Sequence, residues 1–304
     1  MKEPEKTGID WWLSLLKDKE PKVRKKAAQA LGEMHHPRAF RPLLAALRDP
    51  DREVRAHAVT GLARFNYPEA WQAVTGALTD SGDEVRKCAA LALGSFGNPA
   101  AVLPLARALR DADPDVRNLA AIALRQTRDP LAVSALIGAL ADGSEHVRIS
   151  AIESLGRIKD PAAGVPLIAC LKDGSSQVRK TACSALMRMG SGSAEALIRA
   201  LGDKSGDVRY LAAGALGVVG DERAVEPLCA AIGMEFDAIV AVAVGGTSFE
   251  RGDGWLFGTV LGTFAVGVMR NGLNLLGVPS SLQVVSIGLL VIVALFVDGL
   301  KQRS

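Results

Sequence analysis

Asp49-Pro50-Asp51-Arg52-Glu53-Val54-Arg55-Ala56-His57-Ala58-Val59-Thr60-Gly61-Leu62 is one copy of the stretch that decides the fold of this 304-residue chain. Its Val-Arg pair occurs seven times. Five of the intervals between successive pairs are 31 residues long, and the last one is 30. The pairs are Val23-Arg24, Val54-Arg55, Val85-Arg86, Val116-Arg117, Val147-Arg148, Val178-Arg179 and Val208-Arg209. A constant period of this length is typical of a solenoid, in which each repeat buries its apolar face against its neighbours.

Each copy also carries an Asp, an Ala and a Leu at fixed positions. The Ala follows the Val by four residues and the Leu by eight, so the three side chains form one apolar stripe on a helix. The segment before each Asp has the same helical spacing and often begins with Pro, which suits the first turn of a helix. We therefore expect each repeat to be a first helix, a short turn containing the Asp, and a second helix.

This unit resembles the HEAT-like repeats first catalogued in bilin lyases, over residues Trp11 to Ile232. The resemblance implies an all-α solenoid of seven to eight helix pairs. It implies little about function, because such repeats serve many unrelated purposes.

The Asp and Arg of the repeat are expected to be structural and not catalytic, since every copy has them. We predict that each Asp caps the second helix, and that stacking places each Arg beside the Asp of its own or the next repeat. The Asp residues of this ladder are Asp18, Asp49, Asp80, Asp111, Asp142, Asp173 and Asp203, and the Arg residues are Arg24, Arg55, Arg86, Arg117, Arg148, Arg179 and Arg209.

One position of the second helix, two residues after each Val, varies in character and is the candidate partner face. Its residues are Lys25, Ala56, Lys87, Asn118, Ile149, Lys180 and Tyr210. The apolar stripe predicts that this position faces away from the core. Such variation on a regular scaffold is how a solenoid encodes a protein partner, and it is also how neutral drift looks.

The sequence predicts no enzyme, metal or cofactor. No His is followed by Glu, as it is in the HEAT-repeat di-iron hydroxylases, and the four Cys lack zinc-type spacing, so we interpret them as core residues of a reducing compartment. No phosphate-binding Gly-rich loop or nucleophile motif is present. Residues 1–232 hold 32 Lys and Arg against 28 Asp and Glu, a balance too even for a nucleic-acid-binding solenoid.

After Ile232 the repeat stops and the composition changes to Gly, Val, Leu and Ile. One apolar stretch runs from Trp255 to Met269 and extends to Val278 past Arg270, and a second runs from Leu282 to Val297. A bilayer crossing needs about 20 apolar residues. The pair, joined by a turn at Pro279, predicts a two-span transmembrane hairpin.

The segment from Gly233 to the end resembles the last quarter of the permease subunit of ribose-type sugar ABC importers. The resemblance is carried by Glu235-Phe236-Asp237-Ala238-Ile239, Gly245-Gly246-Thr247-Ser248, Gly252, Gly254, Asn271-Gly272-Leu273-Asn274-Leu275-Leu276-Gly277-Val278 and Asp298. It implies that Gly245, Gly246, Thr247, Ser248, Gly252 and Gly254 belong to a cytoplasmic loop that meets an ATPase subunit. Arg251 departs from the family, which usually has Gly there.

We therefore predict two domains, a solenoid of residues 1–232 and a permease-like membrane segment of residues 233–304. The basic residues Lys301 and Arg303 after the second span, and a charged start without a signal peptide, place the solenoid in the cytoplasm at the inner membrane. The expected function is a membrane-tethered scaffold for a protein partner. Two alternatives stay open: a permease-family subunit that works in sugar transport with an ABC ATPase and other permease chains, and a soluble lyase-like repeat protein joined to a permease remnant.

Overall fold

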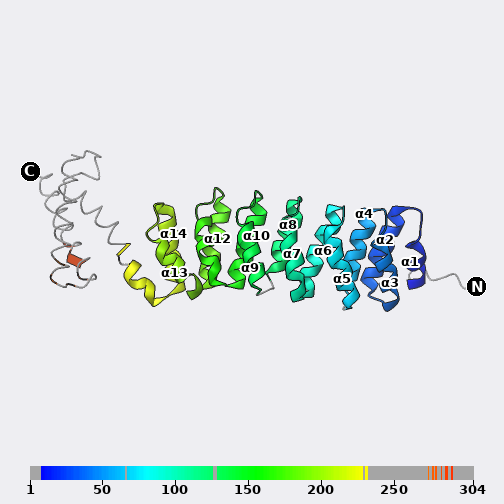
Figure 1. Ribbon diagram of the computed structural model, residues 1–304, viewed down its shortest axis with the longest axis horizontal. Helices are drawn as coiled ribbons and strands as arrows, with labels where there is room; N and C mark the ends of the chain where they lie inside the picture. The colour runs from blue at the N-terminus through cyan, green and yellow to red at the C-terminus, as the bar shows by residue number, and fades with distance from the viewer. Residues whose placement is uncertain are drawn as a thin grey trace, which may run out of the picture. The chain divides into compact units, whose positions relative to one another are not determined.

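The computed structural model (Figure 1) describes residues 8–231, except 66, 126–128 and 229, together with seven isolated positions between 273 and 289. The described residues form fourteen α-helices and five short 3-10 helices, and they contain no β-strand. The prediction of an all-α repeat architecture is confirmed. The predicted hairpin, with its spans at 255–278 and 282–297, lies outside the described residues apart from these isolated positions.

The helices alternate between two layers, one for each half of the repeat. The first helices of the repeats are α1 (Ile9–Leu15), α3 (Phe40–Ala46), α5 (Pro68–Gly76), α7 (Val102–Ala108), α9 (Pro130–Ala139), α11 (Gly164–Cys170) and α13 (Ser191–Ala200). The second helices are α2 (Pro21–Met34), α4 (Arg52–Leu62), α6 (Asp83–Phe96), α8 (Pro114–Leu124), α10 (Glu145–Ile158), α12 (Ser176–Met189) and α14 (Gly206–Val219).

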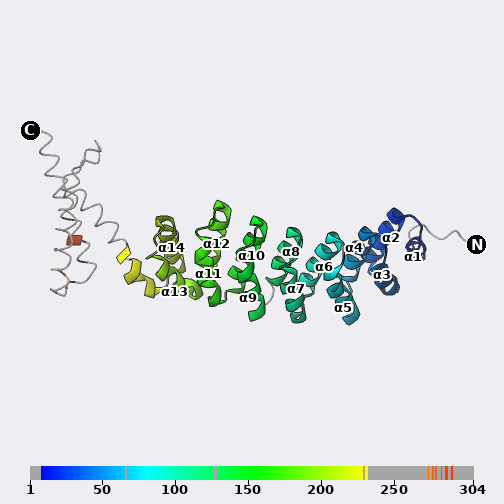
Figure 2. The ribbon, with the colours of Figure 1, turned by 45° about the horizontal axis from the view of Figure 1, so that its top comes forward.

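Each even-numbered helix from α2 to α10 packs against the next even-numbered helix, and each from α2 to α12 packs against the odd-numbered helix of its own repeat. Figures 1 and 2 show the odd-numbered helices of this region along one side and the even-numbered helices along the other. We call these the odd layer and the even layer. Because neighbouring repeats touch along the even layer, and α7 also packs against α9 in the odd layer, each repeat buries its apolar surface against the next.

The core lies between the layers and is built from the predicted stripe. Val54, Ala58 and Leu62 of α4 are fully buried, and the equivalent residues of α6, α8, α10, α12 and α14 are buried as well. Val23, at the edge of the stack, is half-buried. From the odd layer, Leu43, Leu105, Leu136 and Leu167 fill the space opposite the stripe.

Short connections link the helices, and Pro begins several of them. Three first helices are preceded by a 3-10 turn: η1 (Pro37–Ala39), η3 (Pro99–Ala101) and η4 (Pro161–Ala163); η2 (Ala77–Thr79) ends α5, and η5 (Glu222–Ala224) follows α14. The residues before η3 and η4, Asn98 and Asp160, accept hydrogen bonds from backbone N–H groups at the start of the turn. These caps satisfy donors that the helix itself leaves unpaired.

The prediction that the repeat Asp caps the second helix is wrong. The N-cap of α4 is Asp51, two residues after Asp49, and its carboxylate accepts from the N–H groups of Glu53 and Val54. Asp49 instead accepts a 2.9 Å hydrogen bond from the N–H of Asp51. The repeat Asp thus fixes the turn that leads into the helix, and both its oxygens also accept from a more distant partner.

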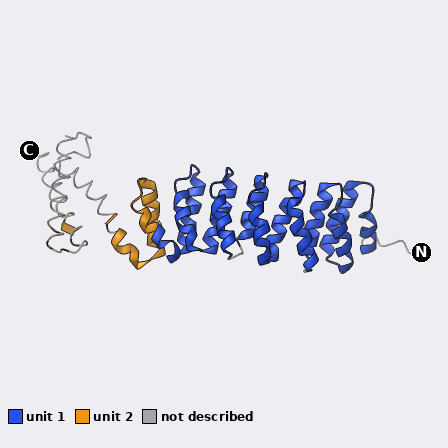
Figure 3. Ribbon diagram, in the orientation of Figure 1, with its two compact units in different colours: residues 1–196 blue, residues 197–304 orange. Residues whose placement is uncertain are grey.

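The chain divides into two compact units, residues 1–196 and residues 197–304 (Figure 3). This division falls inside α13, whereas the predicted domain boundary at residue 232 lies outside the described residues and stays a prediction. No helix in the described part of the chain combines the length and the hydropathy that a bilayer crossing requires.

Candidate functional site: the ladder and the even-layer groove

Arginines and aspartates of successive repeats form a ladder along the turns of residues 1–196. Each Arg pairs with the Asp of the following repeat, with closest N–O distances of 2.7 to 2.8 Å. The pairs are Arg24–Asp49, Arg55–Asp80, Arg86–Asp111, Arg117–Asp142 and Arg148–Asp173. Two N–H groups of each guanidinium reach both carboxylate oxygens, which is the strong bidentate form of this interaction.

The same arginines also bind the turn of their own repeat. The Nη1 of Arg86 donates to the carbonyl oxygen of Asp80 at 2.9 Å, six residues before it. Arg179 and Arg209 make the equivalent bond to the carbonyls of Asp173 and Asp203, at 2.8 and 2.9 Å. Each arginine therefore connects its own turn by the backbone and, in the five pairs above, the next turn by the carboxylate.

The ladder is largely shielded from water, and its charges stabilise one another. In the five pairs, the side chains are 11% to 17% exposed. Burial pushes the pKa of the Asp111 carboxyl up, but the hydrogen bonds from Arg86 and from the N–H of Asp113 outweigh it, so the pKa lies below its ordinary value. The hydrogen bond to Asp111 raises the pKa of Arg86. Both groups are charged at neutral pH and committed to each other.

The position proposed as the partner face is mostly covered by the neighbouring even-layer helix. Lys180 and Tyr210 are exposed, but Ala56 is buried, so the prediction that this position always faces away from the core is wrong there. Lys25 pairs with Glu53 of the next repeat at 2.7 Å, Asn118 accepts from Ser150 at 2.6 Å, and Lys87 lies 3.1 Å from Glu84. Ile149 is half-buried.

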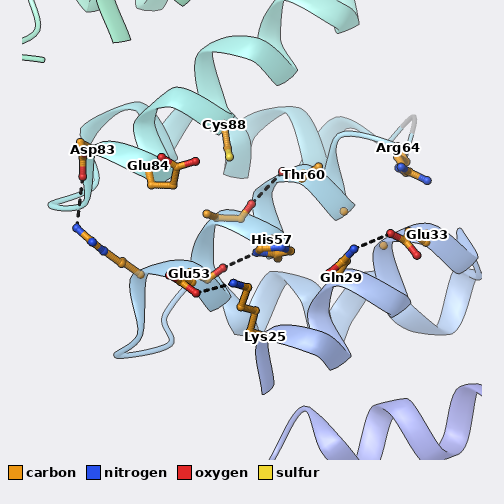
Figure 4. Close-up of a pocket in the computed structure, with 14 residues that line it drawn as sticks. Lys25, Gln29, Glu33, Glu53, His57, Thr60, Arg64, Asp83, Glu84 and Cys88 are labelled. Carbon is orange, nitrogen blue, oxygen red and sulfur yellow. Dashed lines mark hydrogen bonds and ion pairs between the residues drawn. The ribbon is translucent and has the colours of Figure 1, made fainter. Parts of the chain in front are cut away.

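A groove of about 510 Å³ runs over α2, α4 and α6 in the even layer (Figure 4). Most of its lining residues are exposed or half-buried, whereas Gly32, Ala56 and Gly61 are buried, and most of the lining positions differ from copy to copy of the repeat. They are Lys25, Gln29, Gly32, Glu33, Arg52, Glu53, Ala56, His57, Thr60, Gly61, Arg64, Asp83, Glu84 and Cys88. We call this the even-layer groove.

Two glycines allow the helices to approach closely at the base of this groove. A Cβ atom placed on Gly32 would lie 2.6 Å from the Cα of Gly61, a distance that real Cβ atoms do not reach. The backbones of α2 and α4 are therefore in direct contact there.

The groove carries both signs of charge and several groups that can form hydrogen bonds. Glu53 accepts from Lys25, which lowers the pKa of its carboxyl, and its backbone carbonyl lies 2.8 Å from Nδ1 of His57. The guanidinium of Arg64 makes no hydrogen bond or ion pair with the described residues, although its backbone N–H donates to the carbonyl of Gly61. Such a lining suits a polar peptide segment, which presents backbone groups and charged side chains together.

Cysteine chemistry does not contribute to the groove. Burial raises the pKa of the Cys88 thiol, against a hydrogen bond with Thr60, so the nucleophilic thiolate is scarce at neutral pH. Of the other predicted core cysteines, Cys170 is buried and Cys183 half-buried, while Cys229 lies outside the described residues. Across the described ranges, no three His, Cys, Asp or Glu side chains group as metal ligands would.

The sequence did not identify the groove. Its polar lining lies on the side of the helix opposite the stripe. Glu84 comes one residue before the repeat Val of its copy, and His57, Thr60 and Arg64 come three, six and ten residues after theirs. Variation at these positions was a usable signal. The predicted ATPase-coupling loop, Gly245 to Gly254, lies outside the described residues.

The family model for HEAT repeats matches residues 4–49, 40–125, 102–186 and 164–245 of the chain. Among curated proteins, the chain is 45% identical to the ribose import permease protein RbsC of Escherichia coli K12 over 73 residues, which are 24% of this chain and 23% of RbsC. The chain thus spans about a quarter of the length of the curated relatives that it matches.

Two solved structures are similar to the repeats. The Escherichia coli protein YibA is 23% identical with a TM-score of 0.54, over 70% of this chain and 81% of YibA, which shows a shared fold. The complex of CpcE and CpcF of phycocyanin lyase from Nostoc sp. PCC7120 is 26% identical with a TM-score of 0.38, over 75% of this chain and 83% of the other.

Proposed function

Because the chain belongs to the HEAT-repeat family, we propose that it is a protein-binding scaffold, in which the even-layer groove takes an extended polar segment of a partner protein. We further propose that residues 233–304 tether this scaffold to a membrane. The proposal assigns no catalytic role: the ladder arginines and aspartates bind each other, and the thiol of Cys88 stays protonated.

One observation carries the scaffold proposal. A frame of repeated, mutually paired residues supports a groove in which most lining positions differ between repeats. Thr60 and Arg64 are both exposed, and the next repeat has Leu91 and Ser95 at the same places. A surface needed only for stacking would have no reason to depart from the repeat, whereas recognition of one partner requires a particular set of groups.

The tether proposal rests on sequence. The apolar stretches from Trp255 to Val278 and from Leu282 to Val297 each come close to the length of a bilayer crossing. The similarity to RbsC, the ribose import permease, supports a membrane origin for a segment of this size. Two spans return the chain to the side from which it came, so both the solenoid and the basic end at Lys301 and Arg303 would be cytoplasmic.

Site-specific photo-crosslinking tests the groove. A photoreactive amino acid replaces Thr60, which is exposed in the groove, or Gln72, which is exposed on α5 in the odd layer, in the full chain in its native cells. We expect one defined protein adduct from position 60 and none of the same mass from position 72. Equal adducts from both positions, or none from position 60, would contradict the groove as the binding surface.

Membrane extraction tests the tether. The full chain should remain with the membrane pellet through washing in alkaline carbonate, and protease added from the cytoplasmic side should remove the repeats. A shortened chain of residues 1–232 should be soluble and helical by circular dichroism. Release of the full chain by carbonate, or aggregation of the shortened chain, would show that residues 233–304 are buried against the repeats instead.

The similarity to RbsC favours one second candidate, a permease-family subunit that takes part in sugar transport with an ABC ATPase and other permease chains. The predicted coupling loop gives the test. Purification of the full chain in mild detergent would recover an ATPase subunit, and Gly246→Arg would abolish that recovery while leaving the partner crosslinked at position 60 unchanged. The scaffold proposal predicts no ATPase in either preparation.

A further inference from the structure

The odd layer carries basic side chains that no acidic residue balances. Arg41 and Arg48, at α3, and Arg107 and Arg110, at α7, are exposed, and their guanidinium groups make no hydrogen bond or ion pair with the described residues. Glu69 is the one acidic side chain within helices α3, α5, α7, α9 and α11. The even layer differs, because its lysines and arginines lie among carboxylates such as Glu53 and Glu84.

Aliphatic side chains accompany these arginines on the same layer. Leu103 of α7, Leu131 of α9 and Val165 of α11 are 50%, 58% and 59% exposed, although they belong to three successive repeats of a well-packed stack. We call the four arginines and these three side chains the odd-layer face. Isolated exposed Leu residues are ordinary, but a row over consecutive helices beside unpaired arginines is a pattern that indicates a contact surface.

The surface of the odd-layer face beside α7 consists of shallow hollows. One hollow of about 550 Å³ is lined by Leu103, Arg107, Arg110 and Leu131, and another of about 560 Å³ on the α5 side of α7 shares Arg107 and Arg110. The aspartates that border them, such as Asp111 and Asp142, are already paired with ladder arginines. The hollows therefore present guanidinium groups and aliphatic carbon, with their carboxylates neutralised.

We propose that the odd-layer face is a membrane-contact surface that binds the head groups of anionic phospholipids. Guanidinium groups bind phosphate oxygens through two parallel N–H donors, and aliphatic side chains beside them can enter the boundary between head groups and acyl chains. A lipid surface supplies phosphate in a wide array, which matches arginines spread over α3 and α7. An acidic protein would supply carboxylates but would leave the exposed Leu131 and Val165 without apolar partners unless it added them specifically.

The proposal differs from the tether. It concerns exposed side chains of residues 41–165, and it predicts a dependence on lipid charge, which an inserted apolar hairpin does not require. Each basic residue near an anionic bilayer contributes roughly 1 kcal/mol, or about fivefold in binding. Removal of Arg107 and Arg110 should therefore lower the equilibrium constant for contact between the odd-layer face and the bilayer by about thirtyfold.

Hydrogen exchange of the full chain on vesicles tests this contact. The chain is reconstituted with vesicles of phosphatidylcholine alone or with added phosphatidylglycerol, and exchange is followed in peptides from α7 and α9. We expect slower exchange of these peptides with phosphatidylglycerol, and loss of this difference in the double variant Arg107→Glu/Arg110→Glu. The matched control Arg157→Glu/Arg188→Glu makes the same charge change on exposed arginines of α10 and α12 in the even layer, outside the groove, and should keep the difference.

The outcomes separate cleanly. Equal exchange with both lipids, or loss of the difference in the even-layer control as well, would overturn the proposal. Slowed exchange that appears only on adding cell extract and is independent of lipid would assign the face to a protein partner and would also overturn it. Retention on neutral vesicles after alkaline washing reports the tether alone, so failure of the tether and failure of the lipid contact are distinguishable. Circular dichroism of both variants checks that the helices are intact.

Discussion

Two neighbouring residues of α2, Arg24 and Lys25, each reach the next repeat with an N–O distance of 2.7 Å, but the two ion pairs differ in kind. Arg24 and Asp49 are 12% and 11% exposed, and Arg24 also binds two carbonyl oxygens of its own turn. Lys25 and Glu53 are 37% and 53% exposed and share a single hydrogen bond.

The comparison separates what holds the repeats together from what is free to vary. The arginine pair recurs along residues 1–196 and satisfies buried groups that would otherwise lack partners. The lysine pair lies in the lining of the groove, and water can replace it on either side. At the equivalent positions two repeats further on, Lys87 and Asp115 approach only to 4.0 Å. We infer that the regular arginine pairs maintain the stack and that the looser, exposed pairs form the surface that a partner contacts.

The largest effect is expected from breaking one ladder pair. Arg86→Met removes the partner of the Asp111 carboxylate and the donor to the carbonyl of Asp80, while it keeps most of the apolar stem. Leaving a shielded charge unpaired should lower the free energy of unfolding by about 3 kcal/mol. Urea unfolding, monitored by circular dichroism, measures this loss of free energy. A loss no larger than that of Lys25→Met would remove the distinction between the two kinds of pair.

A smaller loss is expected where the even-layer helices touch. A Cβ atom on Gly156 would lie 2.7 Å from the Cβ of Ala185, so Gly156→Ala should force α10 and α12 apart and destabilise the chain by about 2 kcal/mol. Gly138 of α9 has no atom within 4 Å of such a Cβ. Gly138→Ala should therefore stabilise its helix by about 0.5 to 1 kcal/mol. Thermal unfolding of the two variants should shift in opposite directions, and equal shifts would refute the close contact.

Acid should weaken the ladder once the pH falls below about 4. Hydrogen bonds from Arg117 and Arg148 hold the pKa values of Asp142 and Asp173 below their ordinary range, against the effect of burial. A carboxyl whose pKa is lower in the folded chain stabilises it above the unfolded pKa of about 3.9, and this contribution is lost as the pH falls through the folded pKa. Thermal midpoints should be steady from about pH 7 to 5 and fall below about pH 4.

The variant Arg117→Met sharpens this test, because it removes the main cause of the lowered pKa of Asp142. Its stability should fall less steeply with acid than that of the unchanged protein. An identical dependence on pH in both proteins would show that the ladder carboxylates do not control acid unfolding.

The repeat period and the six-residue offset were enough to predict the helix pairs, the buried stripe and the meeting of Arg with Asp. They could not decide whether Arg55 meets Asp49 or Asp80, since that depends on how one repeat is displaced from the next in space. The structure gives both: Arg55 binds the backbone of Asp49 and the carboxylate of Asp80.

The candidate site was less predictable, because a helix in a stack has two buried sides and the stripe reveals one. Val54, Ala58 and Leu62 face the odd layer, but Ala56, between them in sequence, is buried as well. The groove over α2 and α4 also depends on Gly32 and Gly61, whose small size can be read from the sequence but whose contact cannot. The burial of Ala56 and the contact between Gly32 and Gly61 both depend on how neighbouring repeats pack, which a local sequence pattern does not specify.

A double-mutant cycle at Arg86 and Asp111 tests the central claim most directly. The free energies of unfolding of Arg86→Met, Asp111→Ala and the double variant give the coupling between the two side chains, with a cycle at Lys25 and Glu53 as the control. The account predicts a coupling of about 2 kcal/mol in the ladder and none above experimental error in the control. A ladder coupling below about 0.5 kcal/mol, or equal couplings in the two cycles, would contradict it.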